Sequence, residues 1–449
     1  MSATESLVAL SRTGYDEIPD EVLDRAKASI RDVLGVAIYG SQHEVGDRIG
    51  RYVDRTSPGE AATVLGRGTA SPPGAALANG TFAHAIDYDD TFESMVLHPS
   101  APVFPAALAA AEAADATGRD LLTGYVLGVE AEFRVGHSVY PSHYDHGWHH
   151  TGTIGSFGAA AAAASVLDLS PEATTHAFGI VASGSSALKK NFGSMTKPLH
   201  PGHAAQTGLR AAMLADEGFT ADEAILDGEM GYGMVMSPDG SYDPTVIEEG
   251  RDSWGVLDNG FKPYPSGVIS HAAMEAMRRL VAEHDLTPET VERVTVTLDE
   301  AASEMLIHAQ PENELQAKFS IEFCLAAVIR EGDAGVQEFT DEYVTAPATR
   351  AVIDLVDRDF EPDLFGDEFA GYGARVVVET TDGETHTTEE RRAPGSPTNP
   401  LPEARWEAKF DDCVAPVLDE DARATLLDAI DGLEEEGSLD RLVAASRPD

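Results

Sequence analysis

The sequence of 449 residues is poor in basic side chains, with 31 lysines and arginines against 77 aspartates and glutamates and a formal charge of -46. Nucleic acids and anionic membranes bind proteins through basic surfaces, so we exclude both as partners. Only seven of the basic residues are lysines. A solvated acidic surface with little lysine is typical of proteins kept soluble in concentrated salt, where screening weakens the repulsion between like charges, and we expect a halophilic host.

Cysteine is also scarce, since the chain has only Cys324 and Cys413. A disulfide framework is therefore excluded, and a reducing compartment is expected. Two thiolates are too few for an iron-sulfur cluster, which usually takes roughly three or four from its protein. We therefore expect any catalysis to proceed without such a cofactor.

Long hydrophobic runs are missing as well. The amino terminus, MSATESLVALSRTG, lacks the basic start and apolar core of a secretion signal. The longest apolar stretch, residues 157–167, is alanine-rich and much shorter than the roughly 20 residues of a membrane-spanning helix. We expect a soluble, cytoplasmic protein that crosses no membrane.

Apolar residues recur at helical spacing through most of the first 250 or so residues. Glycine and proline separate the segments in which this pattern occurs. The pattern predicts a large helical domain over residues 1–261, with helices at about 19–38, 72–87, 102–116, 120–136, 155–167, 171–182 and 203–216.

The pattern changes after Pro263. Residues 291–298 alternate as a strand, and residues 375–381 lead into an Asp-Gly turn and a second threonine-rich run, which predicts a hairpin. Residues 315–330 read as a helix between them. We therefore predict a smaller α+β domain over residues 262–392, and we expect the helical tail, residues 393–449, to complete the first domain because it is too short for a core of its own.

The first of four segments rich in titratable residues is His-Ala-Ile-Asp-Tyr-Asp-Asp-Thr, residues 84–91, followed by His98. Three aspartates within four positions can orient a polar ligand or raise one another's pKa. A solvated acidic loop is the alternative, because a chain this acidic forms such runs by chance.

The second segment, residues 143–155, holds four histidines and runs into the alanine-rich helix. Its glycines and threonines indicate a helix start, whose N–H groups and dipole would make an anion site with a titratable rim. Four histidines and Asp145 are also enough ligands for zinc or iron, but their spacing matches no standard zinc pattern. We therefore favour the anion site and predict no metal.

The third segment contains Lys189, Lys190 and Lys197, three of the seven lysines within nine residues, followed by His200. A compact ammonium that lies beside a carboxylate in a pocket is harder to replace by arginine than a surface lysine is. The alternative is a chance cluster on the surface.

The fourth segment, residues 261–271, begins with Phe-Lys-Pro-Tyr-Pro and ends at His271, at the expected junction of the two domains. Binding sites often lie at such junctions. The alternative for His271 is a role as a helix cap or in the core.

Taken together, the order and spacing of these motifs resemble the MmgE/PrpD family, which includes 2-methylcitrate dehydratase and cis-aconitate decarboxylase. The resemblance extends over nearly the whole chain, and Lys-Phe-Ser at residues 318–320 adds to it. It implies a large helical domain, a smaller α+β lid and a homodimer. The active-site positions that it implies are catalytic Asp87, His149, Lys197 and His271, and substrate-binding Thr91, His98, His200, Lys262 and Tyr264.

The resemblance implies a cofactor-independent hydro-lyase that acts on a small tricarboxylic hydroxy acid, with no metal. Dehydration removes a proton beside a carboxylate and protonates the departing hydroxyl, and imidazoles suit both transfers. We expect His149 or His271 to be the base and the other the acid, with Lys197 and His98 holding substrate carboxylates.

Two alternatives remain. The chain could be a decarboxylase or isomerase of a related polycarboxylate such as cis-aconitate, although it has Phe319 where the decarboxylase has a tyrosine. It could also be a polycarboxylate-binding or metal-storing protein without catalysis.

Overall fold

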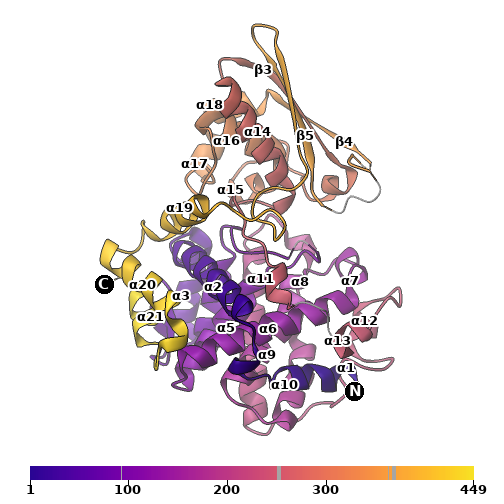
Figure 1. The fold of residues 1–449 in the computed structure, drawn as a ribbon, viewed down its shortest axis with the longest axis vertical. Coiled ribbons are helices and arrows are strands. Elements are labelled where there is room, and N and C mark those ends of the chain that lie inside the picture. The colour runs from indigo at the N-terminus through magenta and orange to yellow at the C-terminus, as the bar shows by residue number, and fades with distance from the viewer. Residues whose placement is uncertain (93, 250–253, 363, 367–370, 449) are drawn as a thin grey trace. The chain divides into compact units, whose positions relative to one another are not determined.

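The computed structural model describes residues 1–92, 94–249, 254–362, 364–366 and 371–448 (Figure 1). Contacts divide the chain into two compact units, residues 1–261 with 413–449 and residues 262–412, which we call the helical unit and the mixed unit. The chain is 56% helical and carries a small mixed sheet, which confirms the predicted fold class.

The helical unit is built from helices and one short hairpin. Its helices are α1 (Ala3–Leu10), α2 (Asp20–Gly40), α3 (Glu44–Thr56), α4 (Pro72–Ala83), α5 (Ser100–Ala113), α6 (Gly118–Val139), α7 (Ser142–Asp145), α8 (His150–Thr153), α9 (Gly155–Val166), α10 (Pro171–Gly184), α11 (Thr196–Asp216), α12 (Tyr232–Met236), α13 (Thr245–Glu248), α20 (Glu420–Asp431) and α21 (Asp440–Ala445). The strands β1 (Ala62–Val64) and β2 (Gly68–Ala70) pair in antiparallel fashion.

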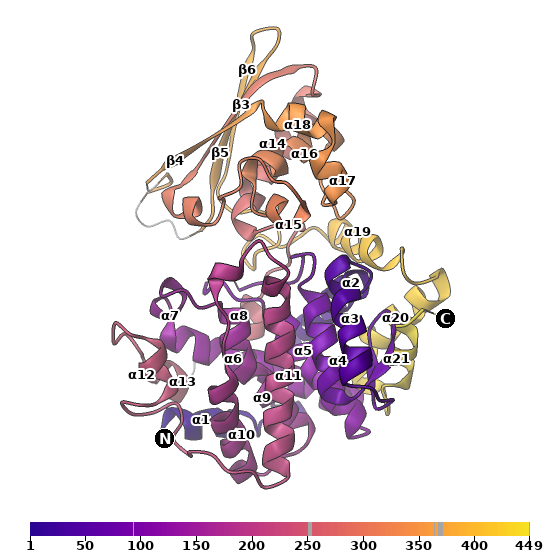
Figure 2. The same ribbon diagram turned by 180° about the vertical axis from the view of Figure 1, so that it is seen from behind.

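The core of the helical unit forms around α9, which is buried on almost all sides. A helix that is apolar all round must lie inside a protein, and the alanines of α9 let its neighbours come close. It packs against α5, α6, α10 and α11, and α11 also packs against α4 (Figure 2). This packing brings the chain before α5 and the first turn of α11 into one region of the unit.

Two helix boundaries differ from the prediction, and both differences affect the site. The helix predicted over residues 72–87 ends at Ala83, and the chain after it forms a loop in which Asp87 has a positive φ of 56°. The helix predicted from residue 203 begins at Thr196 and therefore includes Lys197. Apolar periodicity misses the start of α11 because, apart from Leu199, residues 196–201 are polar or proline.

The mixed unit holds a four-stranded sheet in the order β4-β3-β5-β6. Its strands are β3 (Val291–Asp299), β4 (Val356–Glu361), β5 (Ala374–Thr380) and β6 (Thr385–Glu390), and its helices are α14 (His271–His284), α15 (Glu314–Ala317), α16 (Ile321–Glu331), α17 (Asp341–Thr345) and α18 (Pro347–Ile353). The strand β3 pairs with β4 in parallel and with β5 in antiparallel fashion. The helix α19 (Glu403–Val414) crosses into the helical unit at its end.

The predicted strands and hairpin of the mixed unit are confirmed. Val294, Val296 and Leu298 of β3 are buried, and their spacing of two places them on one face of the strand. The β5–β6 hairpin turns at Gly383, which has a φ of 90° that favours glycine. The helix predicted over residues 315–330 is instead α15 and α16, because the Ser320 hydroxyl accepts a hydrogen bond from the Phe323 backbone N–H and begins a new helix.

Among the described residues, none of the helices combines the length and the hydrophobicity that crossing a bilayer requires.

Candidate active site

The three aspartates of residues 87–90 are buried, and each binds a different partner. Asp87 Oδ2 lies 2.7 Å from Lys197 Nζ. Asp89 binds the imidazole of His84, and Asp90 binds groups at the start of α5. The alternative of a solvated acidic loop is therefore wrong, and the run is a set of three separate contacts.

Asp90 holds the loop in place. Its carboxylate accepts hydrogen bonds from the backbone N–H of Ser100 at 3.1 Å, from the Ser100 hydroxyl and from the Asn259 amide. Thr91 and Gly260 exchange two backbone hydrogen bonds of 2.9 Å each. Burial and the neighbouring Asp32 carboxylate raise the pKa of Asp90 to about 7.

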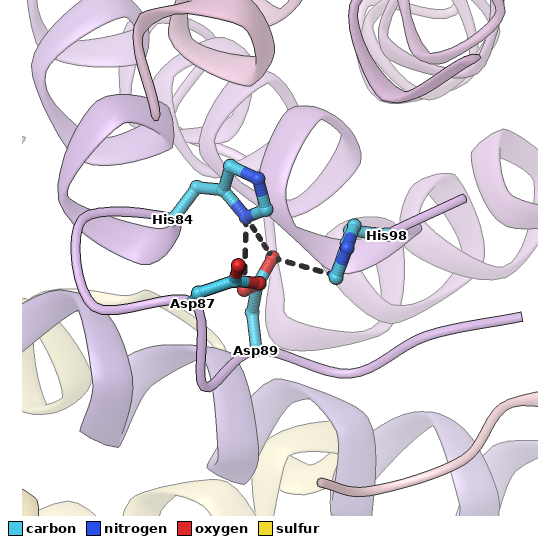
Figure 3. A group of neighbouring side chains, drawn as sticks. All are labelled: His84, Asp87, Asp89 and His98. Atoms are coloured by element: carbon cyan, nitrogen blue, oxygen red, sulfur yellow. Dashed lines mark hydrogen bonds and ion pairs between the residues drawn. The ribbon is translucent and has the colours of Figure 1, made fainter. Parts of the chain in front are cut away.

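Asp89 lies between two imidazoles (Figure 3). Both of its carboxylate oxygens are 2.9 Å from His84 Nδ1, and Oδ2 is 3.4 Å from His98 Nδ1. The His98 Nδ1 is also 2.9 Å from the Asp90 carbonyl oxygen. A carbonyl oxygen can only accept, so His98 Nδ1 carries a hydrogen. The rings of His84 and His98 meet edge to face with their centres 4.5 Å apart.

A second imidazole pair extends the site. The Nδ1 atoms of His149 and His200 are 2.9 Å apart, so one ring donates to the other. The centre of the His149 ring lies 5.9 Å from that of His84. Burial, His200 and Lys197 lower the pKa of His149 well below its usual value. Burial and Lys197 lower the pKa of His200 to about 4, so both rings are neutral at neutral pH.

Lys197 reaches Asp87 because α4 and α11 approach closely. At Gly80 an added Cβ would lie 2.8 Å from the Cα of Gly202, and at Gly202 it would lie 2.4 Å from the carbonyl oxygen of Leu77. Only hydrogen atoms fit at these two positions. The ammonium of Lys197 is buried and lies 5.5 Å from the centre of the Phe192 ring.

The remaining predicted residue of the helical unit, Thr91, is buried, and its hydroxyl donates to the Leu97 carbonyl oxygen at 3.3 Å. The helical unit thus brings together six of the nine predicted residues, namely Asp87, Thr91, His98, His149, Lys197 and His200.

The other three predicted residues lie close together in the mixed unit. Lys262 Nζ and His271 Nε2 are each 3.2 Å from the carbonyl oxygen of Ser266, to which both donate. The Tyr264 hydroxyl donates to Glu275 Oε2 at 3.0 Å, and the Tyr264 and His271 ring centres are 5.7 Å apart. Burial raises the pKa of Tyr264, so its hydroxyl remains a donor.

Two histidines of residues 143–155 prove to be core residues. His143 Nδ1 donates to the Met236 carbonyl oxygen at 3.1 Å, and its Nε2 is 2.9 Å from the Thr153 hydroxyl. His150 Nδ1 donates to the Met95 carbonyl oxygen at 2.8 Å. Burial lowers the pKa of His143 to about 4. Both ring nitrogens of His143 have protein partners, whereas His150 is bonded through Nδ1 and its buried Nε2 has no hydrogen-bond partner among the described residues.

Within the part of the chain that the structure describes, one group of histidine and carboxylate side chains is close enough to hold a metal ion. It consists of His84, Asp87, Asp89 and His98, whose ligand atoms lie within 4.8 Å of one another. The same atoms already form the Lys197–Asp87 ion pair and the Asp89–imidazole contacts. An ammonium beside Asp87 already supplies the positive charge that a cation would bring.

Sequence reasoning did not assign His84 and Asp89 to the site. The signal was present, because both lie in the segment with the three aspartates. Their relationship depends on the tight loop after α4, which brings side chains five positions apart into bidentate contact.

Comparison with known proteins gives matches over nearly all of the chain. The MmgE/PrpD N-terminal domain matches residues 9–245, and the MmgE/PrpD C-terminal domain matches residues 264–435.

Three characterised relatives carry the same name. The cis-aconitate decarboxylase of Homo sapiens is 29% identical over 97% of this chain and 92% of its own length. That of Mus musculus is 28% identical over 97% of this chain and 91% of its own. That of Aspergillus terreus is 26% identical over 94% of this chain and 91% of its own.

Proposed function

Since this chain belongs to the MmgE/PrpD family, we propose that it is a cofactor-independent lyase that acts on a small tricarboxylic acid. The observation that carries the proposal is the buried group around the Lys197–Asp87 ion pair, in which imidazoles, carboxylates and one ammonium meet in the helical unit. The names of the relatives support the same substrate class.

The proposed reaction is the dehydration of a 2-methylcitrate-like hydroxy acid. The base removes a proton from the carbon beside a carboxylate, and the electron pair of that C–H bond forms the C=C bond. The C–O bond breaks at the neighbouring carbon, and the departing hydroxyl takes a proton from the acid and leaves as water. The reaction needs two groups of opposite protonation state and a cation for the carboxylates.

We assign the base to His149. Because burial, His200 and Lys197 keep its pKa low, this ring is neutral and ready to accept a proton. In the tautomer in which its Nδ1 donates to His200, the lone pair lies on Nε2. Lys197 binds a substrate carboxylate, and Asp87 orients the ammonium at 2.7 Å.

Thr91 and His200 bind substrate in this proposal. The Thr91 hydroxyl donates to the Leu97 carbonyl oxygen, and His200 shares a hydrogen bond with His149. In the mixed unit, His271 stays a predicted catalytic residue, and Lys262 and Tyr264 stay predicted substrate-binding residues; their polar groups donate within that unit to the Ser266 carbonyl oxygen and to Glu275.

Decarboxylation of cis-aconitate is a second candidate, because the relatives named above are cis-aconitate decarboxylases. There the C–C bond to a carboxylate breaks, CO2 leaves, and a carbon of the remaining allylic system takes up a proton. Phe319 favours dehydration, because it offers no hydroxyl where the decarboxylase has a tyrosine.

We further propose that the enzyme works in the cytoplasm as a homodimer. The small number of cysteines supports a reducing compartment. The resemblance to the family supports the dimer. Size-exclusion chromatography with light scattering in high salt tests it, and a mass near twice 47.6 kDa is expected.

The experiment that tests the function is an assay of purified protein in high salt with 2-methylcitrate, citrate and cis-aconitate separately. Proton NMR follows the alkene signals, and trapped CO2 is counted. Alkene formation from 2-methylcitrate without CO2 supports the dehydratase, and CO2 from cis-aconitate supports the decarboxylase. No turnover of any of the three, together with stoichiometric bound zinc or iron, would contradict both and favour a metal-binding protein.

A further inference from the structure

Asp89 is a fully buried carboxylate that none of the predicted roles includes. Its two oxygens are both 2.9 Å from His84 Nδ1, which fixes the plane of the carboxylate. The same oxygen, Oδ2, is 3.4 Å from His98 Nδ1 (Figure 3). An ionised carboxylate can only accept hydrogen bonds, so His84 Nδ1 carries a hydrogen that it donates to Asp89.

The hydrogen on His98 Nδ1 is donated to the Asp90 carbonyl oxygen 2.9 Å away, and the Asp89 carboxylate lies beside the same nitrogen at ion-pair distance, 3.4 Å. The protonation state of His98 can therefore change only at Nε2. The backbone N–H of His98 donates to the Thr151 hydroxyl at 3.1 Å, which also fixes the backbone of this residue. The ring is thus held through Nδ1, and proton uptake and release take place at Nε2.

The surroundings of His98 and His149 differ in charge. His98 faces the carboxylate of Asp89, the ring of His84 at 4.5 Å and the ring of His149. His149 faces His200, Lys197, His84 and His98, which are all cationic or neutral. A carboxylate beside an imidazole favours the imidazolium, whereas a neighbouring ammonium favours the neutral ring. One ring is therefore suited to give a proton and the other to accept one.

We propose that Asp89 is a positioning residue that holds His98 as the imidazolium acid of the reaction, while His84 orients Asp89. This inference rests on the proposed lyase function and assigns the acid left open there. In the dehydration, His149 Nε2 takes the proton of the breaking C–H bond, and His98 Nε2–H gives its proton to the departing hydroxyl, which leaves as water. Solvent returns one proton to His98 and removes one from His149, so the protons balance.

The test compares wild type with Asp89→Asn and with the matched control Glu132→Gln, a buried carboxyl elsewhere in the same unit. Loss of general-acid catalysis should lower kcat of Asp89→Asn by about 10²- to 10⁴-fold. The basic limb of its pH–rate profile should move to lower pH by about one unit or more, because the neighbouring negative charge is gone. The acidic limb, which reports His149, should stay in place, and Glu132→Gln should keep both limbs.

Nitrogen-15 NMR of histidine-labelled wild type provides a second readout that needs neither substrate nor a stable variant. His98, identified by the signal missing in His98→Gln, should be an imidazolium near pH 6 and a Nδ1–H ring when neutral. An Nε2–H tautomer in wild type, or an Asp89→Asn enzyme whose two limbs both stay in place, would overturn the inference.

These readouts separate the two proposals. If none of the three acids is turned over but His98 has the expected protonation, the lyase proposal fails and the Asp89–His98 relationship stands. If turnover occurs and His98 is a neutral Nε2–H ring, the lyase proposal stands and the inference fails.

Discussion

Lys197 and Asp87, 110 positions apart in the sequence, form an ion pair of 2.7 Å in the interior of the helical unit. Their side chains are 8% and 5% exposed, so the pair is held almost without water. Asp87 adopts a φ of 56°, a conformation that aspartate tolerates better than most residues. The pair joins the loop after α4 to the first turn of α11.

Replacing Lys197 by Met should abolish turnover and also lower the free energy of unfolding by roughly 3–5 kcal/mol, because the buried Asp87 carboxylate loses its ammonium partner. The double variant Lys197→Met with Asp87→Asn should recover most of that stability and none of the activity. Urea unfolding and the alkene assay measure the two effects. Lys190→Met, which changes an exposed lysine, is the control. Wild-type turnover in Lys197→Met would remove the assignment.

The sequence was enough to predict the fold class: apolar residues at helical spacing predicted the helices, and alternation with an Asp-Gly turn predicted the strand β3 and the β5–β6 hairpin. Helical spacing failed at residues 84–87 and 196–202, because the loop and the first turn of α11 depend on buried polar contacts that have no periodicity. The order and spacing of the motifs predicted six residues of the candidate site in the helical unit. They missed His84 and Asp89, because only the three-dimensional turn shows which of three aspartates binds which partner.

Gly202→Ala should weaken both folding and catalysis. Its Cβ would lie 2.4 Å from the Leu77 carbonyl oxygen, so α11 must move away from α4. Overpacking of this kind costs roughly 1–3 kcal/mol, and it should displace Lys197 from Asp87. Thermal unfolding measures the first effect, and kcat the second. The control is Gly437→Ala, whose added Cβ would meet open space and should change neither quantity. Gly218→Ala is unsuitable as a control, because a φ of 81° strains any residue with a side chain.

Glu132→Gln should make stability less dependent on pH. Burial and Asp90 raise the pKa of Glu132 well above 4.5, and its two carboxyl oxygens have no hydrogen-bond partner among the described residues. The folded state therefore binds a proton that the unfolded state releases, and wild type loses stability as the pH rises above the unfolded pKa. Above the unfolded-state pKa, the free energy of unfolding of the variant should rise relative to that of wild type by about 1.4 kcal/mol per pH unit. A difference in free energy of unfolding between the variant and wild type that stays constant from pH 5 to pH 8 would contradict a buried, protonated Glu132.

Chelators should leave turnover unchanged. The ligand atoms of His84, Asp87, Asp89 and His98 are engaged with one another and with Lys197, which leaves the group suited to proton transfer rather than to a cation. The measurement is activity before and after dialysis against EDTA, with metal analysis of both samples. Loss of activity that Zn²⁺ or Fe²⁺ restores would show that the cluster holds a metal.

The central claim is that His149 removes a proton from the carbon beside a substrate carboxylate. The most direct measurement runs the reaction to equilibrium in D2O with the accepted acid and follows deuterium at that carbon by NMR. Wild type should incorporate deuterium there, and His149→Gln should incorporate none above background in the same time. Unchanged incorporation in His149→Gln would contradict the account.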